Sequence, residues 1–160
     1  MHIARRIVLA LAIVALLAAP MLASAQIVDK KALTLEAAKR IAAAAEAEAK
    51  KNNWNQVIAI VDDGGHLIYL QRLDETQTGS VRIAIEKARS AAAFKRPTKV
   101  WEDSLAGGRQ AVLGLPGTIP SEGGIPLTAG GKVIGAIGVS GGTAPQDGQV
   151  AKAGADILPK

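Results

Sequence analysis

One serine lies in a pattern that some hydrolases use for nucleophilic catalysis. Gly138-Val-Ser140-Gly-Gly142 matches G-x-S-x-G and follows an apolar run, as a nucleophile at a sharp strand-to-helix turn would. That chemistry requires an acid and then a histidine later in the chain, whereas His66 precedes Ser140. We therefore interpret the pattern as a glycine-rich strand end on which another backbone packs closely.

Carboxylates gather around the same histidine. Asp62 and Asp63 precede His66 and Asp74 follows it, so these side chains could hold a cation loosely. Their spacing matches no closed metal site, and aspartate is common in turns, so we favour a polar turn with solvated carboxylates. The glycines from Gly135 to Gly141 have the wrong spacing for dinucleotide binding. Because no acid–base pair stands at a recognisable spacing, we expect no conventional enzyme active site.

Residues 1–25 have the layout of a secretory signal peptide. Two arginines, Arg5 and Arg6, precede an unbroken apolar run, and Ala23-Ser-Ala25 is a small-residue cleavage site. The apolar run is too short to span a bilayer comfortably. We expect residues 26–160 to form a single mature domain that is periplasmic or secreted and has no membrane association after cleavage.

Composition excludes several kinds of chemistry and of binding partner for this mature chain. The 160-residue sequence has a formal charge of +5, which falls to +3 when the two leading arginines are removed. The absence of cysteine excludes disulfides, thiolate nucleophiles and iron–sulfur clusters. Basic and acidic residues are interleaved and aromatic residues are few, so nucleic-acid binding is not expected.

The residue inventory limits how the chain could hold haem iron. Both methionines and one of the two histidines lie within residues 1–25. Bis-histidine, histidine–methionine and thiolate ligation are therefore impossible within one mature protomer. The iron ligand would have to be His66, Tyr69, a weaker oxygen donor such as a threonine, or residues from two subunits.

Hydrophobic periodicity and turn residues predict an α+β fold with a largely antiparallel sheet, because the links between strands are of hairpin length. An alanine-rich apolar stripe on the first helix indicates close packing on that sheet. The predicted helices are Leu35–Lys51, Ser80–Phe94, Thr98 to about Ala106, and Asp147–Leu158. The predicted strands are Gln56–Asp62, His66–Leu73, Gly117–Ser121, Ile125–Ala129 and Lys132–Ser140.

Several blocks together resemble the GlcG/HbpS family, which includes the C-terminal domain of PduO-type proteins. The blocks run in order from about Leu33 to Leu158: Thr34-Leu-Glu-Ala-Ala38, Val61-Asp-Asp-Gly-Gly-His-Leu67, Glu86-Lys-Ala-Arg-Ser-Ala-Ala-Ala-Phe94 with Pro97-Thr98, Gly123-Gly-Ile-Pro-Leu127, and Gly135-Ala-Ile-Gly-Val-Ser-Gly-Gly142. The resemblance implies a profilin-like α/β (α+β) domain, with a five-stranded antiparallel sheet flanked by helices. It also implies homo-oligomers and, for HbpS-like members, secretion and haem binding.

The resemblance also suggests residues for a haem site. In HbpS-like proteins haem coordination is attributed to a threonine oxygen, and Thr98 is the position most similar to it, with Thr118 as a rival. Lys87, Lys95 and Arg96 could pair with the haem propionates, or they could be solvated charges near a helix end. Helix one contains no histidine, so the histidine ligands of some relatives cannot be assumed.

We therefore predict an exported haem-binding protein that sequesters or senses haem, with Thr98 or His66 near the iron. Slow, non-enzymatic haem breakdown is a further hypothesis. The alternative is a small-molecule-binding or assembly module associated with glycolate or diol metabolism, which would use the same domain without haem.

Overall fold

The computed structural model describes residues 28–159, so the predicted signal peptide at 1–25 lies outside the described residues. The helices are α2 (Leu35–Lys51), α3 (Gly79–Phe94), α4 (Lys99–Ala106) and α5 (Ala144–Ala155), with a 3-10 helix η1 (Gln110–Gly114). The strands are β1 (Val57–Asp62), β2 (Leu67–Arg72), β3 (Gly124–Ala129) and β4 (Lys132–Ser140).

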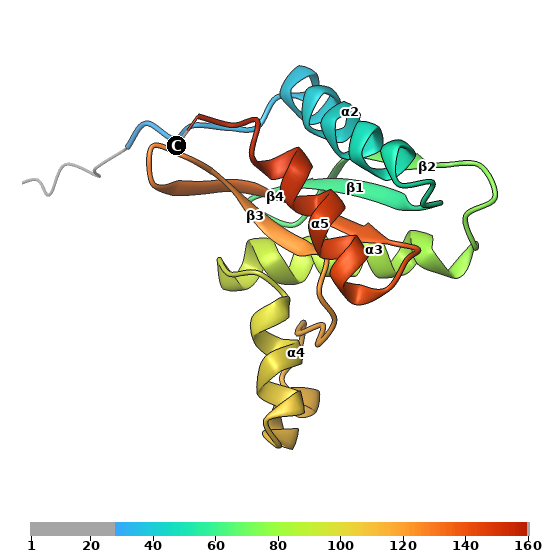
Figure 1. The fold of residues 1–160 in the computed structure, drawn as a ribbon. Coiled ribbons are helices and arrows are strands. Elements are labelled where there is room, and N and C mark those ends of the chain that lie inside the picture. The colour runs from blue at the N-terminus through green and yellow to red at the C-terminus, as the bar shows by residue number, and fades with distance from the viewer. Residues whose placement is uncertain (1–27, 160) are drawn as a thin grey trace, which may run out of the picture. The chain divides into compact units, whose positions relative to one another are not determined.

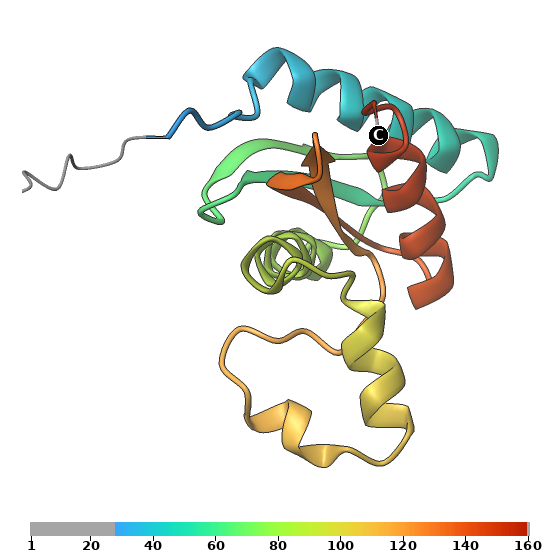
Figure 2. The same cartoon turned by 90° about the vertical axis from the view of Figure 1, so that its left-hand side faces the viewer.

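All four strands form one antiparallel sheet in the order β2-β1-β4-β3. Helices α2 and α5 cover one face of the sheet and α3 covers the other (Figures 1 and 2). Strand β1 supplies side chains to both layers by simple alternation, because Ile58 and Ile60 join the α2–α5 core, whereas Val57 and Ala59 pack with α3. The mixed α+β architecture predicted from the sequence is confirmed.

Small side chains bring α2 close to the sheet. Thr34 caps the helix by accepting a hydrogen bond from the Ala37 backbone N–H at 3.2 Å. The buried positions are those of the predicted stripe: Ala38, Ile41, Ala42, Ala45 and Ala49. Leu35, which the stripe also included, is instead half exposed, because it occupies the first turn at the edge of the layer.

Helix α3 lies against β4 at a glycine. A Cβ atom at Gly138 would lie 2.0 Å from the Ala84 carbonyl oxygen and 2.5 Å from the Ala88 backbone nitrogen. No side chain fits between these backbones, so the interpretation of this segment as a close-packing strand end agrees with the geometry. Ser140 is the last residue of β4 and is buried opposite Val57, inside the sheet.

The sheet differs from the prediction in strand number. Five strands were predicted, but the described residues form four, because Gly117–Ser121 is a loop. Gly117 has a φ of +80° and Pro120 has no N–H to donate to a ladder, so both residues favour turns. This loop returns from an arm, defined as residues 95–123, which carries α4 and η1 away from the sheet (Figure 2).

The closing helix also begins earlier than predicted, at Ala144 instead of Asp147. Thr143 and Gln146 form a capping box, and a proline follows in the first turn, where its missing N–H costs nothing. Among residues 28–159 no helix has the length and apolar character needed to cross a membrane.

Candidate functional site

The β1–β2 turn holds His66 in a defined orientation. Asp62 Oδ1 accepts hydrogen bonds from the backbone N–H groups of Gly64 and His66, each at 2.8 Å. The His66 Nδ1 atom lies 3.2 Å from both Asp62 carboxylate oxygens. Burial opposes ionisation of Asp62, but the hydrogen bonds from His66 and Gly64 together outweigh it and lower the pKa of the carboxyl. Asp62 therefore stays ionised and fixes the ring through Nδ1, which leaves Nε2 for a ligand.

His66 faces a hollow of about 430 Å³, here called the hairpin cleft, which is lined by residues 63–66 together with Arg89 and Ala93 of α3. The imidazole is 83% exposed. Arg89 Nε donates to the Gly65 carbonyl oxygen at 3.2 Å, which ties the turn to the helix. The hairpin cleft thus combines an accessible nitrogen donor with a fixed guanidinium.

A second hollow shares Arg89 with the hairpin cleft and has a more apolar lining. Its side chains include Leu67 of β2, with Val81 and Ile85 of α3. Arg82 adds a second guanidinium to its rim. Leu67 is 45% exposed, which leaves apolar surface available to a flat hydrophobic molecule.

The two threonine candidates are both engaged within the protein. Thr98 is fully buried, its Oγ1 accepts a hydrogen bond from the Gly124 N–H at 2.9 Å, and its own N–H donates to the Gly124 carbonyl. Thr118 Oγ1 lies 2.9 Å from the carbonyl oxygens of both Val112 and Leu115 and donates to this pair. The Thr98 hydroxyl therefore joins the arm to β3, whereas the Thr118 hydroxyl closes a turn within the arm.

The basic candidates divide between surface and interior. Lys95 ends α3 in the left-handed conformation, with a φ of +53°, and is exposed. Arg96 is also exposed, and its guanidinium carbon lies 5.3 Å from the centre of the Trp101 ring. Lys87, in contrast, is buried, and its Nζ lies 2.7 Å from Asp147 Oδ2.

The ion pair between Lys87 and Asp147 is the polar centre of the domain, and the sequence analysis missed it. The other carboxylate oxygen, Oδ1, accepts hydrogen bonds from Gln56 Nε2 and from the Gly142 N–H, both at 3.0 Å. Burial raises the pKa of Asp147, although Lys87, Gly142 and Gln56 act in the opposite direction. Gln56 Oε1 is buried and has no hydrogen-bond partner among the described residues.

The candidates thus fall into separate groups. Lys87 and Thr98 meet at one glycine pair, where a Cβ on Gly123 would lie 3.0 Å from Lys87 Nζ and one on Gly124 would lie 2.6 Å from Thr98 Cγ2. His66 lies instead at the turn beside Arg89. Among residues 28–159 no three His, Cys, Asp or Glu side chains gather to hold a metal ion.

Tested as haem ligands, the candidates differ in access. His66 fits, because its ring is exposed and Nδ1 is already held by a carboxylate, the arrangement found behind many metal-ligating histidines. Thr98 does not fit in this conformation, because its oxygen is buried and accepts a backbone hydrogen bond.

Arg89, which lines the hairpin cleft, was not predicted as a site residue. The sequence did offer a signal for it, since Arg89 lies in the same family-like block as Lys87.

The fold and the site define an α+β domain with helices on both faces of an antiparallel sheet and a histidine-bearing cleft at one hairpin. A family model described as "Haem degrading protein HbpS-like" matches residues 33–156, and the chain belongs to this HbpS-like family. The predicted GlcG/HbpS resemblance is thereby confirmed.

Individual relatives agree with this assignment. The chain is 47% identical over 111 residues to protein GlcG of Escherichia coli K12, covering 69% of this chain and 83% of GlcG. The crystal structure of a double mutant of Streptomyces reticuli HbpS is similar with a TM-score of 0.77 and 34% identity, covering 89% of this chain and 99% of HbpS. The crystal structure of a PduOC–heme complex is similar with a TM-score of 0.72 and 26% identity, covering 80% of this chain and 96% of PduOC.

Proposed function

We propose that this protein binds haem in the hairpin cleft, with His66 Nε2 as the iron ligand, and that it sequesters or senses haem after export. The observation that carries the proposal is the contact of both Asp62 oxygens with His66 Nδ1, which orients an exposed imidazole for a metal. The HbpS-like family assignment and the similarity to the heme-bound PduOC structure support it.

The surroundings of His66 suit the rest of a haem molecule. Arg82 would pair with one propionate, and a guanidinium is well matched to a carboxylate. Arg89 already pairs with Glu86 at 2.8 Å and would use its remaining N–H donors for the other propionate. The porphyrin would lie over Leu67, Val81 and Ile85, where exposed apolar surface would be buried. When bound, haem would supply an iron centre able to coordinate small ligands and exchange electrons.

The remaining candidates have other roles in this proposal. Lys95 and Arg96 follow Ala93 of the cleft by two and three residues, so they would add positive charge near the propionates. Lys87 is already paired with Asp147 and would support the fold. Ligation by Thr98 would require breaking its hydrogen bond with Gly124, and it is retained as a rival in the test.

Haemin titration of the purified protein tests the proposal. We expect a shifted Soret band that saturates at about one haemin per chain. The affinity should fall at least about tenfold in His66→Ala, which removes the ligand, and in Asp62→Asn, which removes the carboxylate that orients it. Thr98→Ala is the matched control and should keep the shift. No Soret shift would refute haem binding, and loss of the shift in Thr98→Ala with retention in His66→Ala would transfer the ligand to Thr98.

The same preparations test the wider proposals. Fractionation and N-terminal sequencing would show export with cleavage after Ala25, and light scattering would show a homo-oligomer. Haem breakdown predicts that peroxide bleaches the bound Soret band faster than it bleaches free haemin. If haemin is not bound and a small organic acid or diol raises the melting temperature with concentration, the small-molecule or assembly module is the better function.

A further inference from the structure

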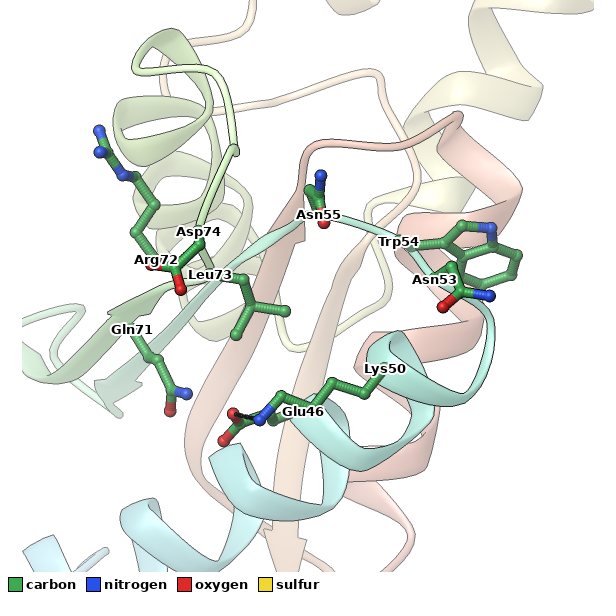
Figure 3. A pocket seen from close by; sticks show the side chains of 9 residues that line it. All are labelled: Glu46, Lys50, Asn53, Trp54, Asn55, Gln71, Arg72, Leu73 and Asp74. Carbon is green, nitrogen blue, oxygen red and sulfur yellow. Dashed lines mark ion pairs between the residues drawn. The ribbon is translucent and has the colours of Figure 1, made fainter.

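A third hollow, lined mainly by polar side chains, lies at the opposite end of the β1–β2 pair from His66. It has a volume of about 390 Å³ and lies between the last turns of α2, the link into β1 and the exit of β2 (Figure 3). Glu46 and Lys50 come from α2, Asn55 from the link, and Gln71 and Leu73 from β2 and the residue after it. The hollow shares no residue with the hairpin cleft.

Side chains on one wall of this hollow are already held in place. Lys50 Nζ lies 2.6 Å from Glu46 Oε1. Tyr69 donates its hydroxyl hydrogen to Gln71 Oε1 at 3.3 Å. The Glu46 carboxyl accepts hydrogen bonds from Lys50, which has the larger effect, and from Gln71, and both lower its pKa. A ligand would therefore meet polar groups whose orientation is set before it arrives, which reduces the entropy lost on binding.

The charged side chains of the lining are mostly paired with one another. Two carboxylates, Glu46 and Asp74, accompany one cation, Lys50. Arg72 also borders the hollow, but it is paired with Val57 across the strands, so its side chain lies on the α3 face and points away (Figure 3). Hydrogen bonding and charge from Glu46, with a smaller contribution from Asp74, raise the pKa of Lys50. Since one carboxylate is left over, the hollow does not attract a phosphate. A single unpaired carboxylate also supplies too few oxygen ligands to hold a metal cation. A zwitterion would also gain little, because Glu46 and Lys50 are already partners.

We propose that this hollow binds a small neutral polyhydroxy compound of monosaccharide size. The Asn55 amide offers both a donor and an acceptor, and the Asp74 carboxylate offers acceptors, which neighbouring hydroxyls can satisfy together. The second N–H of the Gln71 amide adds a donor beside them. Leu73 lies at the centre of the lining (Figure 3), where it offers apolar surface to C–H groups. The proposal is independent of haem binding.

Ligand-observed NMR on the full protein tests this proposal, with D-glucose, D-galactose and myo-inositol as probes and with glycine and inorganic phosphate as the charged alternatives. We expect at least one polyhydroxy probe to bind saturably with a Kd of about 1 mM, and the charged compounds not to bind. Asn55→Ala and Gln71→Ala should each weaken binding about fivefold, the effect of one lost hydrogen bond.

The matched control is Gln110→Ala, which removes an exposed glutamine side chain outside the hollow and should leave binding unchanged. Asn55 is exposed, so Asn55→Ala keeps the test valid if Gln71→Ala fails to fold. The proposal is overturned if no polyhydroxy probe binds below about 50 mM, a very weak affinity. It is also overturned if glycine or phosphate binds instead, or if both pocket variants bind like the parent protein.

Discussion

Replacing Lys87 by methionine should destabilise the protein severely, because it removes the only cation that pairs with buried Asp147 among the described contacts. The two side chains are 2% and 3% exposed, and their charged atoms are 2.7 Å apart. Methionine fills a similar volume but leaves a carboxylate that solvent cannot reach. Breaking one side of such a pair costs about 3–5 kcal/mol, a large part of a domain's usual stability of about 5–15 kcal/mol.

The double variant Lys87→Met/Asp147→Asn separates lost charge pairing from lost packing. An asparagine oxygen can still accept from Gln56 Nε2 and from the Gly142 N–H, as Asp147 Oδ1 does. The double variant therefore contains no buried charge at this position and should regain about 2 kcal/mol relative to Lys87→Met. Urea unfolding followed by circular dichroism at pH 7 measures all three free energies.

The cost of Lys87→Met should also depend on pH. Burial already raises the pKa of Asp147, and the variant removes the opposing effect of Lys87. A carboxyl whose pKa is higher in the folded than in the unfolded protein binds its proton more tightly when folded, so stability increases as pH falls between the two values. The loss in Lys87→Met should shrink from pH 7 towards pH 5, whereas the double variant should not show this change. A loss below about 1 kcal/mol, or one independent of pH, would refute the reasoning.

Two further predictions concern the backbone. Gly138→Ala should lower the free energy of unfolding in urea by at least about 3 kcal/mol, because its Cβ would lie 2.0 Å from the Ala84 carbonyl oxygen. The control Gly114→Ala places its Cβ in open space and should be nearly neutral. Equal losses of stability in the two variants would contradict the packing argument. Gln146→Ala should cost about 1 kcal/mol by removing the hydrogen bond that Gln146 Oε1 accepts from the Thr143 N–H, whereas an unchanged unfolding midpoint would show that this bond contributes nothing.

Local patterns predicted the elements well where the signal was contained within a few residues. The threonine cap and alanine stripe placed α2 within its observed bounds, and the Asp63-Gly-Gly65 turn predicted the hairpin that carries His66. The segment from Gly117 to Ser121 misled the prediction, because its apolar residues resemble a strand while its glycine and proline force turns. Apolar content alone does not distinguish a short strand from a loop anchored over a core.

The central ion pair could not be found in the same way. Lys87 and Asp147 are 60 residues apart in sequence, and neither stands in a local pattern that identifies its partner. One signal was present, because Lys87 shares a helix face with the buried Ala84 and Ala91, at spacings of three and four residues. A lysine that lies on the alanine-rich face of a helix can be predicted to be buried, but the residue that pairs with it becomes evident only from the tertiary structure.

The contact of α3 with Gly138 has a consequence for the evolution of the binding surface. The same helix supplies Arg89 and Ala93 to the hairpin cleft, so the gap between helix and turn depends on how deeply α3 sits on the sheet. That depth is determined by main-chain atoms meeting at a glycine, and no cleft side chain takes part in the contact. Apart from Arg89, which ties the turn to the helix, residues lining the cleft can therefore be exchanged without altering its width. This allows relatives with one scaffold to diverge in the ligands they select.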